Sequence, residues 1–205
     1  ENKLSNGIYA KDLVLHIINQ LGVKAGVGYA YEFAGPAISA LSMEERMTVC
    51  NMSIEGGARC GYINPDETTF NYIKDKLCAP QNENWEKAVK WWKSLKSSDN
   101  CIYDDIFTLD ASKVEPTITW GITPGQSIGV NQKIPFLKEI HPNDQFIAGE
   151  AYEYMGFKPG QSIKDTPIDV CFIGSCTNGR ISDLRVAAQV LKNHKVAKNI
   201  KAFVV

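Results

Sequence analysis

The sequence lacks an excess of charge of either sign. It carries 22 Lys and Arg residues against 23 Asp and Glu residues, which leaves a net charge of −1 over 205 residues. Proteins that bind nucleic acid or anionic membranes use a basic surface to neutralise phosphate groups, so we expect neither as a main partner. Apolar runs close to the roughly 20 residues that span a bilayer are missing. Internal repeats are missing as well, which excludes a repeat architecture.

The cysteines lack the patterns that hold metals or build disulfide frameworks. None of the six forms a Cys-x-x-Cys pair, and their use is typical of a reducing compartment, so we predict a cytoplasmic location. We expect structural roles for five of them: Cys50, Cys60, Cys78, Cys101 and Cys171. The histidines have no acidic or cysteine partner at a recognisable spacing, and we predict structural or surface roles for them: His16, His141 and His194.

What the sequence does contain is enough apolar residues, 44%, for one large or two small domains. Helical spacing of apolar residues predicts helices at 10–21, from Ser42 to about 56, from Pro65 to about 77 and at 85–92. Short β-rich runs predict strands at 27–33, 62–63, 102–109 and 117–120. The stretch 131–167 holds four prolines and little periodicity. We therefore predict an α/β protein with domains at 1–130 and 166–205 and a connecting segment at 131–165.

The most informative segment is 170–180. Residues 170–173 are apolar and predict a buried strand, Gly174 and Ser175 turn the chain, and a helix follows, with Thr177 or Asn178 as its N-cap. The last residues, 201–205, begin another strand, which makes this region β–α–β. Cys176 lies where the helix begins, and the positive end of the helix dipole favours the thiolate form that binds iron. One such ligand does not hold an iron–sulfur cluster.

A second pair of polar residues, Asn51 and Glu55, lies four residues apart on the helix predicted to begin at Ser42. Side chains at this spacing project together. The predicted apolar line of this helix is Met43, Met47, Cys50 and Ile54, which puts the pair beside a core face. An amide and a carboxylate there could orient a hydroxyl or a metal-bound water, whereas the alternative is a solvated pair next to the core. Spacing alone does not decide between them.

Several segments, taken in order, resemble the aconitase superfamily and, within it, the large-subunit family of 3-isopropylmalate dehydratases. They are GYAYEF at 28–33, ALSM at 40–43, CNMSIEGGA at 50–58, PDETTF at 65–70, TWG at 119–121 and FIGSCTNGR at 172–180. The resemblance runs through the whole chain. It implies a three-layer α/β/α second domain of the aconitase type, followed by the start of the next, cluster-binding α/β domain.

The resemblance also implies roles for single residues. Cys176 matches the first of three cysteine ligands of a [4Fe–4S] cluster, and Asn51 and Glu55 match the pair that faces the cluster and the substrate hydroxyl. The later Cys-x-x-Cys of the family is not present in this sequence, nor are the residues of its first domain and of its separate small subunit. We therefore expect an internal segment of a longer enzyme that holds no cluster and is inactive by itself.

The function implied by the resemblance is that of a hydro-lyase. Such an enzyme interconverts 2-isopropylmalate and 3-isopropylmalate, small 2-hydroxy dicarboxylates, by dehydration and rehydration in leucine biosynthesis. Three thiolates leave one iron open as a Lewis acid for the hydroxyl, and Glu55 could hold or protonate the departing oxygen. The alternatives are homoaconitase or another hydro-lyase of the superfamily, a non-catalytic anion-binding module at Gly174 to Gly179, and a thiol nucleophile at Cys176.

Overall fold

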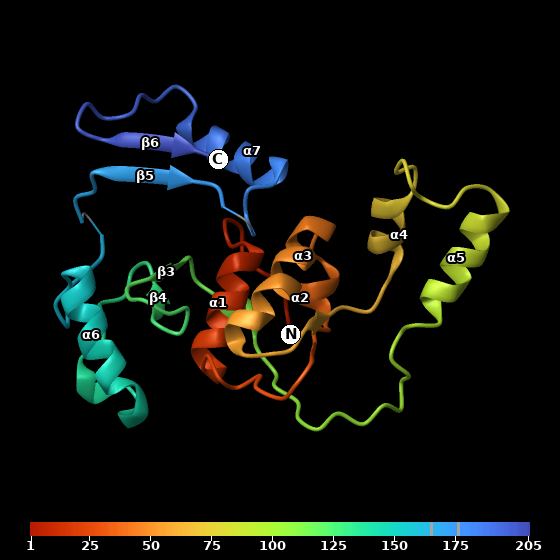
Figure 1. The fold of residues 1–205 in the computed structure, drawn as a ribbon, viewed down its shortest axis with the longest axis horizontal. Helices are drawn as coiled ribbons and strands as arrows, with labels where there is room; N and C mark the ends of the chain where they lie inside the picture. The colour runs from red at the N-terminus through yellow and green to blue at the C-terminus, as the bar shows by residue number, and fades with distance from the viewer. Residues whose placement is uncertain (165, 176) are drawn as a thin grey trace. The chain divides into compact units, whose positions relative to one another are not determined.

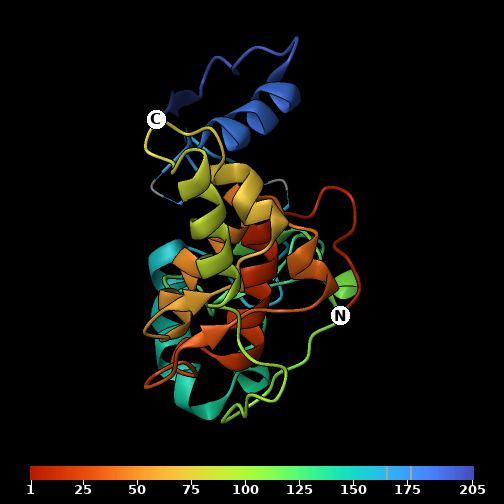
Figure 2. The ribbon, with the colours of Figure 1, turned by 90° about the vertical axis from the view of Figure 1, so that its right-hand side faces the viewer.

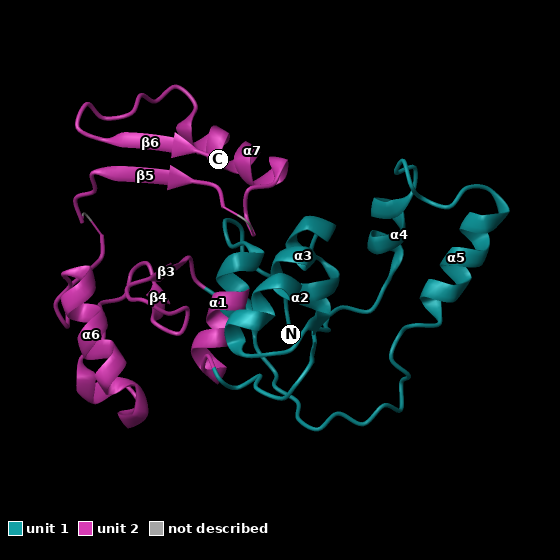
Figure 3. Ribbon diagram, in the orientation of Figure 1, with its two compact units in different colours: residues 1–13, 24–114 teal, residues 14–23, 115–205 magenta. Residues whose placement is uncertain are grey.

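The computed structural model describes residues 1–164, 166–175 and 177–205. Figure 1 shows the order of elements along the chain, and Figure 3 shows its two compact units. The first unit consists of residues 1–13 and 24–114, and the second consists of residues 14–23 and 115–205. Helix α1 (Ala10–Leu21) therefore contributes its first turn to the first unit and its remainder to the second. The domain boundaries expected at 131 and 166 stay a prediction.

The first unit is built from short helices around one small parallel sheet. Strands β1 (Tyr31–Glu32) and β2 (Gly61–Tyr62) pair in parallel, so that Tyr31 lies opposite Gly61. The strand expected at 27–33 is thus reduced to two residues. The helical elements are α2 (Pro36–Ser39), α3 (Met43–Met52), the 3₁₀ turn η1 (Ser53–Gly56), α4 (Glu67–Ile73), α5 (Glu83–Lys93) and η2 (Ala111–Lys113).

Helix α3 begins as the sequence predicts and buries a different face. The Ser42 hydroxyl accepts a hydrogen bond from the Glu45 amide at 3.3 Å, and the Glu45 carboxylate accepts one from the Ser42 amide at 2.8 Å, which together form a capping box. The expected apolar line of Met43, Met47, Cys50 and Ile54 is wrong. The side chains that α3 buries are instead Arg46, Thr48, Val49 and Met52. Burial here is decided by an ion pair of Arg46, which the apolar pattern does not contain.

Helices α4 and α5 pack through aromatic rings. In both views of the ribbon, α5 lies beside α4 (Figures 1 and 2). The Trp92 ring stacks on the Phe70 ring with centroids 6.1 Å apart, and Trp85 meets Trp92 edge to face at 5.7 Å. These are favourable geometries for aromatic pairs. The shared face of Trp85 and Trp92 is therefore a packing surface.

A polar cluster ties the end of β1 to the segment that follows α5. The Glu32 carboxylate accepts hydrogen bonds from the Asn64 amide at 2.8 Å and from the Ser97 hydroxyl at 2.6 Å. The Asn64 side-chain oxygen in turn accepts from the Ser97 backbone amide at 2.9 Å. The segment 102–109, which we expected to be a strand, has no regular structure. Several of its apolar residues, Ile102, Ile106 and Phe107, are exposed.

The second unit has its core around Trp120. Strands β3 (Thr117–Thr119) and β4 (Ser127–Gly129) form an antiparallel pair, and Trp120 stacks on Tyr152 with ring centroids 5.2 Å apart. Two 3₁₀ turns, η3 (Leu137–Glu139) and η4 (Pro142–Asp144), precede helix α6 (Gln145–Met155). The proline-rich stretch 131–165 predicts a connecting segment without this helix. Helix α6 lacks a strong apolar pattern because its buried side is made of small residues, Ala148 and Ala151, together with Tyr152.

The end of the chain folds as the predicted β–α–β unit. Strand β5 (Val170–Ile173) pairs in parallel with β6 (Lys201–Val204), and α7 (Ile181–Leu191) connects them. The structure is thus a mixed α/β arrangement, as expected, with each named sheet containing two strands. Among the helices of the described part of the chain, none combines the length and apolar character needed to cross a bilayer.

Candidate active site

The predicted pair Asn51 and Glu55 lies at the junction of α3 and η1 in the first unit. Asn51 is in the last turn of α3, whereas Glu55 is on the 3₁₀ turn that follows, and both residues are exposed. The expectation that both belong to one regular helix is therefore wrong. A 3₁₀ step rotates the chain by about 120° instead of about 100°, so the angular offset between the two residues grows from about 40° to about 80°. They share a surface, but they do not project in parallel.

Two close contacts fix the junction that carries the pair. The hydroxyl of Ser53, which is only 1% exposed, donates to the Cys50 carbonyl at 2.6 Å. Strand β2 lies directly behind, since a Cβ atom placed on Gly61 would be 2.8 Å from Cys50 Cα and 2.6 Å from Ser53 Oγ. Burial raises the pKa of the Cys50 thiol, with Cys60 as a smaller cause, in keeping with a structural role for Cys50.

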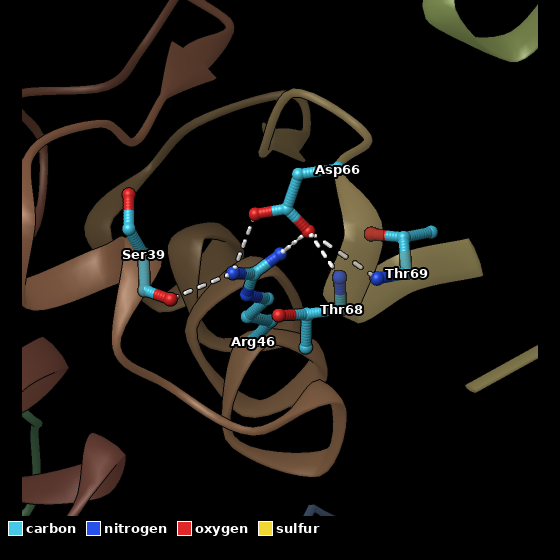
Figure 4. A network of polar contacts seen from close by, with 5 residues as sticks. All are labelled: Ser39, Arg46, Asp66, Thr68 and Thr69. Atoms are coloured by element: carbon cyan, nitrogen blue, oxygen red, sulfur yellow. Dashed lines mark hydrogen bonds and ion pairs between the residues drawn. The ribbon is translucent and has the colours of Figure 1, made fainter. Parts of the chain in front are cut away.

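The electrostatic centre of the first unit is the Arg46–Asp66 ion pair (Figure 4). The Arg46 guanidinium donates to Asp66 through Nη1 at 2.6 Å and through Nη2 at 2.8 Å, and Nη2 also donates to the Ser39 carbonyl at 3.0 Å. One side chain thus links the end of α2, the middle of α3 and the start of α4. Such bidentate pairs fix geometry as well as adding energy.

Asp66 also caps α4, whose helix the sequence predicts. Its Oδ1 atom accepts from the amides of Thr68 at 3.0 Å and Thr69 at 3.3 Å. The hydrogen bonds from Arg46 hold the pKa of Asp66 below its ordinary value, against a smaller opposing effect of burial. The apolar pattern of the sequence does not predict this ion pair. The available signal was the position of Arg46, which lies three residues before Val49 and so on the same side of the helix.

Cys176 lies outside the described residues, and its predicted role stays a prediction. The chain bends beside it through Gly174 and Ser175, whose φ angles are 123° and 124°. The predicted N-caps Thr177 and Asn178 are wrong, because the N-cap of α7 is Arg180. The Arg180 backbone amide donates to the Asp183 carboxylate at 3.0 Å. A carboxylate bound at this position disfavours a second anion there, which weakens the anion-binding alternative.

The described residues do not by themselves fit an iron–sulfur cluster. In the described ranges, no three side chains of His, Cys, Asp or Glu come close enough together to hold a metal ion. Cys171 is half-buried on β5, and the cysteines that the structure describes form no disulfide. His16 is partly buried, which lowers its pKa against the opposing charge of Glu115. These observations give Cys171 and His16 no part in a metal centre built from described residues.

Comparison with known proteins defines the family. The model of the aconitase family (aconitate hydratase) matches residues 1–205. The chain belongs to the aconitase family. One relative, the 3-isopropylmalate dehydratase large subunit of Prochlorococcus marinus subsp. pastoris, is 91% identical over all 205 residues, which cover 44% of that relative. The protein of the same name from Synechocystis sp. is 63% identical over 202 residues, or 98% of this chain and 43% of the relative. The chain thus spans less than half the length of these members of the aconitase family.

Proposed function

We propose that the chain is part of the large subunit of a 3-isopropylmalate dehydratase, in which Asn51 and Glu55 act at the active site. The observation that carries this proposal is the 91% identity, over the whole chain, to a relative of that name. The longer protein would interconvert 2-isopropylmalate and 3-isopropylmalate together with a separate small subunit. Its domains would follow the aconitase arrangement, with a three-layer α/β/α domain at 1–130 and the start of the next domain at 166–205. The unpaired cysteines support a cytoplasmic location.

We assign the cluster to the longer protein, with Cys176 as one thiolate ligand. The other ligands would have to come from parts of the protein outside residues 1–205. By itself the 205-residue chain is then expected to remain colourless after anaerobic reconstitution. About four irons per chain, with the absorption of a [4Fe–4S] cluster, would contradict this expectation.

Glu55 has the chemistry needed for the hydroxyl group of a 2-hydroxy acid. Hydroxide is a poor leaving group, and a carboxylic acid that donates its proton to the departing oxygen lets it leave as water, while the C–H proton on the neighbouring carbon would pass to a base elsewhere in the longer protein. In the rehydration step the carboxylate takes the proton back. The Asn51 amide supplies a neutral donor and acceptor on the same surface, suited to orienting the hydroxyl. Glu55 is exposed, and none of the ion pairs between described residues includes it, so its carboxylate is available to a ligand.

The proposal is tested in the full-length large subunit, assembled with its small subunit. Glu55→Gln should lower kcat by on the order of 10²-fold while leaving the iron content near that of the wild type. Asn51→Ala should lower activity more than its loss of thermal stability explains. The matched control is Glu44→Gln, which neutralises a carboxylate in the first turn of α3 and should change kcat little.

Two further measurements separate the alternatives. Cys176→Ser should abolish the cluster and the activity with the fold retained, whereas a variant that kept its iron and its turnover would remove the ligand assignment. Turnover of homocitrate in preference to 3-isopropylmalate would point to homoaconitase. If Glu55→Gln keeps the wild-type kcat, Asn51 and Glu55 are solvated surface residues without a catalytic role.

A further inference from the structure

The turn that carries Glu55 is held by contacts with the 26–31 segment. The backbone amide of Gly26 donates to the carbonyl of Gly56 at 2.9 Å, and the Tyr31 hydroxyl lies 3.5 Å from the same oxygen. Gly56 is the last residue of η1, immediately after Glu55. A contact made by a residue some 30 positions earlier in the sequence therefore fixes the Gly56–Gly57 peptide, one residue beyond the candidate acid.

The neighbouring backbone leaves no room for a side chain at this contact. A Cβ atom placed on Gly26 would overlap the Ala58 amide nitrogen and would lie 2.7 Å from Ala58 Cα and 2.8 Å from the Tyr31 hydroxyl oxygen. Two of these three atoms belong to backbone and cannot rotate away. The φ angle of Gly26 is not among the positive ones, so its backbone conformation does not call for glycine. Glycine is required here because the neighbouring backbone comes so close.

The turn is also closed on itself. The Gly57 amide donates to the Ile54 carbonyl at 2.8 Å, and the Ala58 amide donates to the Ser53 carbonyl at 3.2 Å. Gly57 has a φ angle of 87°, which favours glycine. At the other end of the turn, the buried Ser53 hydroxyl holds the Cys50 carbonyl. The backbone of η1 is therefore fixed at both ends, while the side chains of Ile54 and Glu55 remain exposed.

We propose that Gly26 and Ser53 are positioning residues for Glu55, which they hold in place by clamping the two ends of the η1 turn. This inference rests on the proposed function of Glu55. Positioned groups lose much of their effect when they move by about 1 Å, because the reacting geometry is then no longer populated. A methyl group at residue 26 must shift either Ala58 or the 26–31 segment, and either shift is transmitted to the Gly56 peptide.

The test is a double-mutant cycle in the full-length large subunit with its small subunit. Gly26→Ala should lower kcat by about 10-fold or more, with a smaller effect on KM, because a displaced acid is lost in the transition state and not in substrate binding. In the Glu55→Gln background, Gly26→Ala should lower kcat by less than about 2-fold, because residue 55 no longer carries an acid that could be displaced. Gly149→Ala is the matched control, because a Cβ atom at Gly149 in α6 meets no atom within 4 Å. It should leave kcat unchanged in both backgrounds.

Ser53→Ala keeps the test decisive if Gly26→Ala does not fold. It adds no atom and removes one hydrogen bond from the other end of the turn, so a smaller loss of kcat, again absent in the Glu55→Gln background, is expected. If Gly26→Ala or Ser53→Ala lowers kcat by the same factor with and without Glu55→Gln, these residues contribute to general stability only, and the inference is overturned. Wild-type kcat in Glu55→Gln would instead remove the proposed function itself. If Glu55→Gln is slow but Gly26→Ala and Ser53→Ala both keep the wild-type kcat, this inference is wrong and the proposed function of Glu55 stands.

Discussion

The Arg46–Asp66 pair makes an asymmetric prediction about stability. The Arg46 side chain is 2% exposed, whereas that of Asp66 is 44% exposed. Removing the charge of Asp66 leaves a buried guanidinium without its counter-ion, which in a fully buried pair costs about 3–5 kcal/mol. Because water reaches the Asp66 side of this pair, we expect Asp66→Asn to cost about 2–3 kcal/mol. Asparagine remains a good N-cap, so the α4 cap is retained.

Removing the other partner should cost much less. Arg46→Met replaces the buried charge with an apolar side chain of similar length and leaves Asp66 hydrated, so the expected cost is below about 1 kcal/mol. The double variant should then be more stable than Asp66→Asn alone, since the asparagine no longer faces an uncompensated charge. Glu67→Gln is the neighbouring control. Its pair with Lys93 joins side chains that are 73% and 56% exposed, and its loss should cost less than about 0.5 kcal/mol.

The assay is urea unfolding of the 205-residue chain, followed by circular dichroism, with hydrogen exchange of the α3 amides as the local measurement. Since the chain has two compact units, the exchange data assign the change in free energy of unfolding to the first unit. Equal costs for Asp66→Asn and Arg46→Met, or a double variant no more stable than Asp66→Asn, would refute the argument that desolvation of Arg46 sets the magnitude.

Two further predictions follow from the same unit and from α6. The pKa of Asp66 lies below its ordinary value of 3.8, so its ion pair stabilises the fold above that pH and is lost as the pH falls through the folded-state pKa. The stability difference between wild type and Asp66→Asn should therefore shrink below about pH 4 and stay constant from pH 5 to 7; a constant difference down to pH 2 would contradict it. In thermal unfolding, Gly61→Ala should lower the free energy of unfolding by more than about 2 kcal/mol, because its Cβ atom meets the Cys50 backbone at 2.8 Å. Gly149→Ala should raise the free energy of unfolding by about 0.5–1 kcal/mol, because its Cβ atom meets no atom within 4 Å. The opposite order of stabilities would contradict both assignments.

The parts of the fold that sequence predicts well are those fixed by local chemistry. Examples are helix α1, the start of α3 at Ser42 and the elements of the β–α–β unit, each of which is indicated by apolar spacing or turn residues within its own segment. The failures involve partners far apart in sequence. Helix α3 buries Arg46 because Asp66 lies across from it, and no apolar pattern within residues 43–56 contains that information.

The candidate site divides in the same way. Residue types and spacing select Asn51 and Glu55, but they do not show that the α-helix changes to a 3₁₀ turn at Ser53, where Gly26 and Gly61 lie against the turn. Gly26 gives no functional signal in a single sequence, since a glycine within VKAGVGY at 23–29 is equally consistent with an ordinary loop. Only the packing against Ala58 distinguishes it.

The separation between buried and exposed charges in the first unit bears on the proposed chemistry. Arg46 is buried and Asp66 is partly exposed, and their bidentate pair leaves little net charge. Glu55 is exposed and has no ion-pair partner among the described residues. Because Asp66, and not Glu55, serves as the counter-ion of Arg46, the Glu55 carboxylate remains open to the hydroxyl of a ligand, as its proposed role requires.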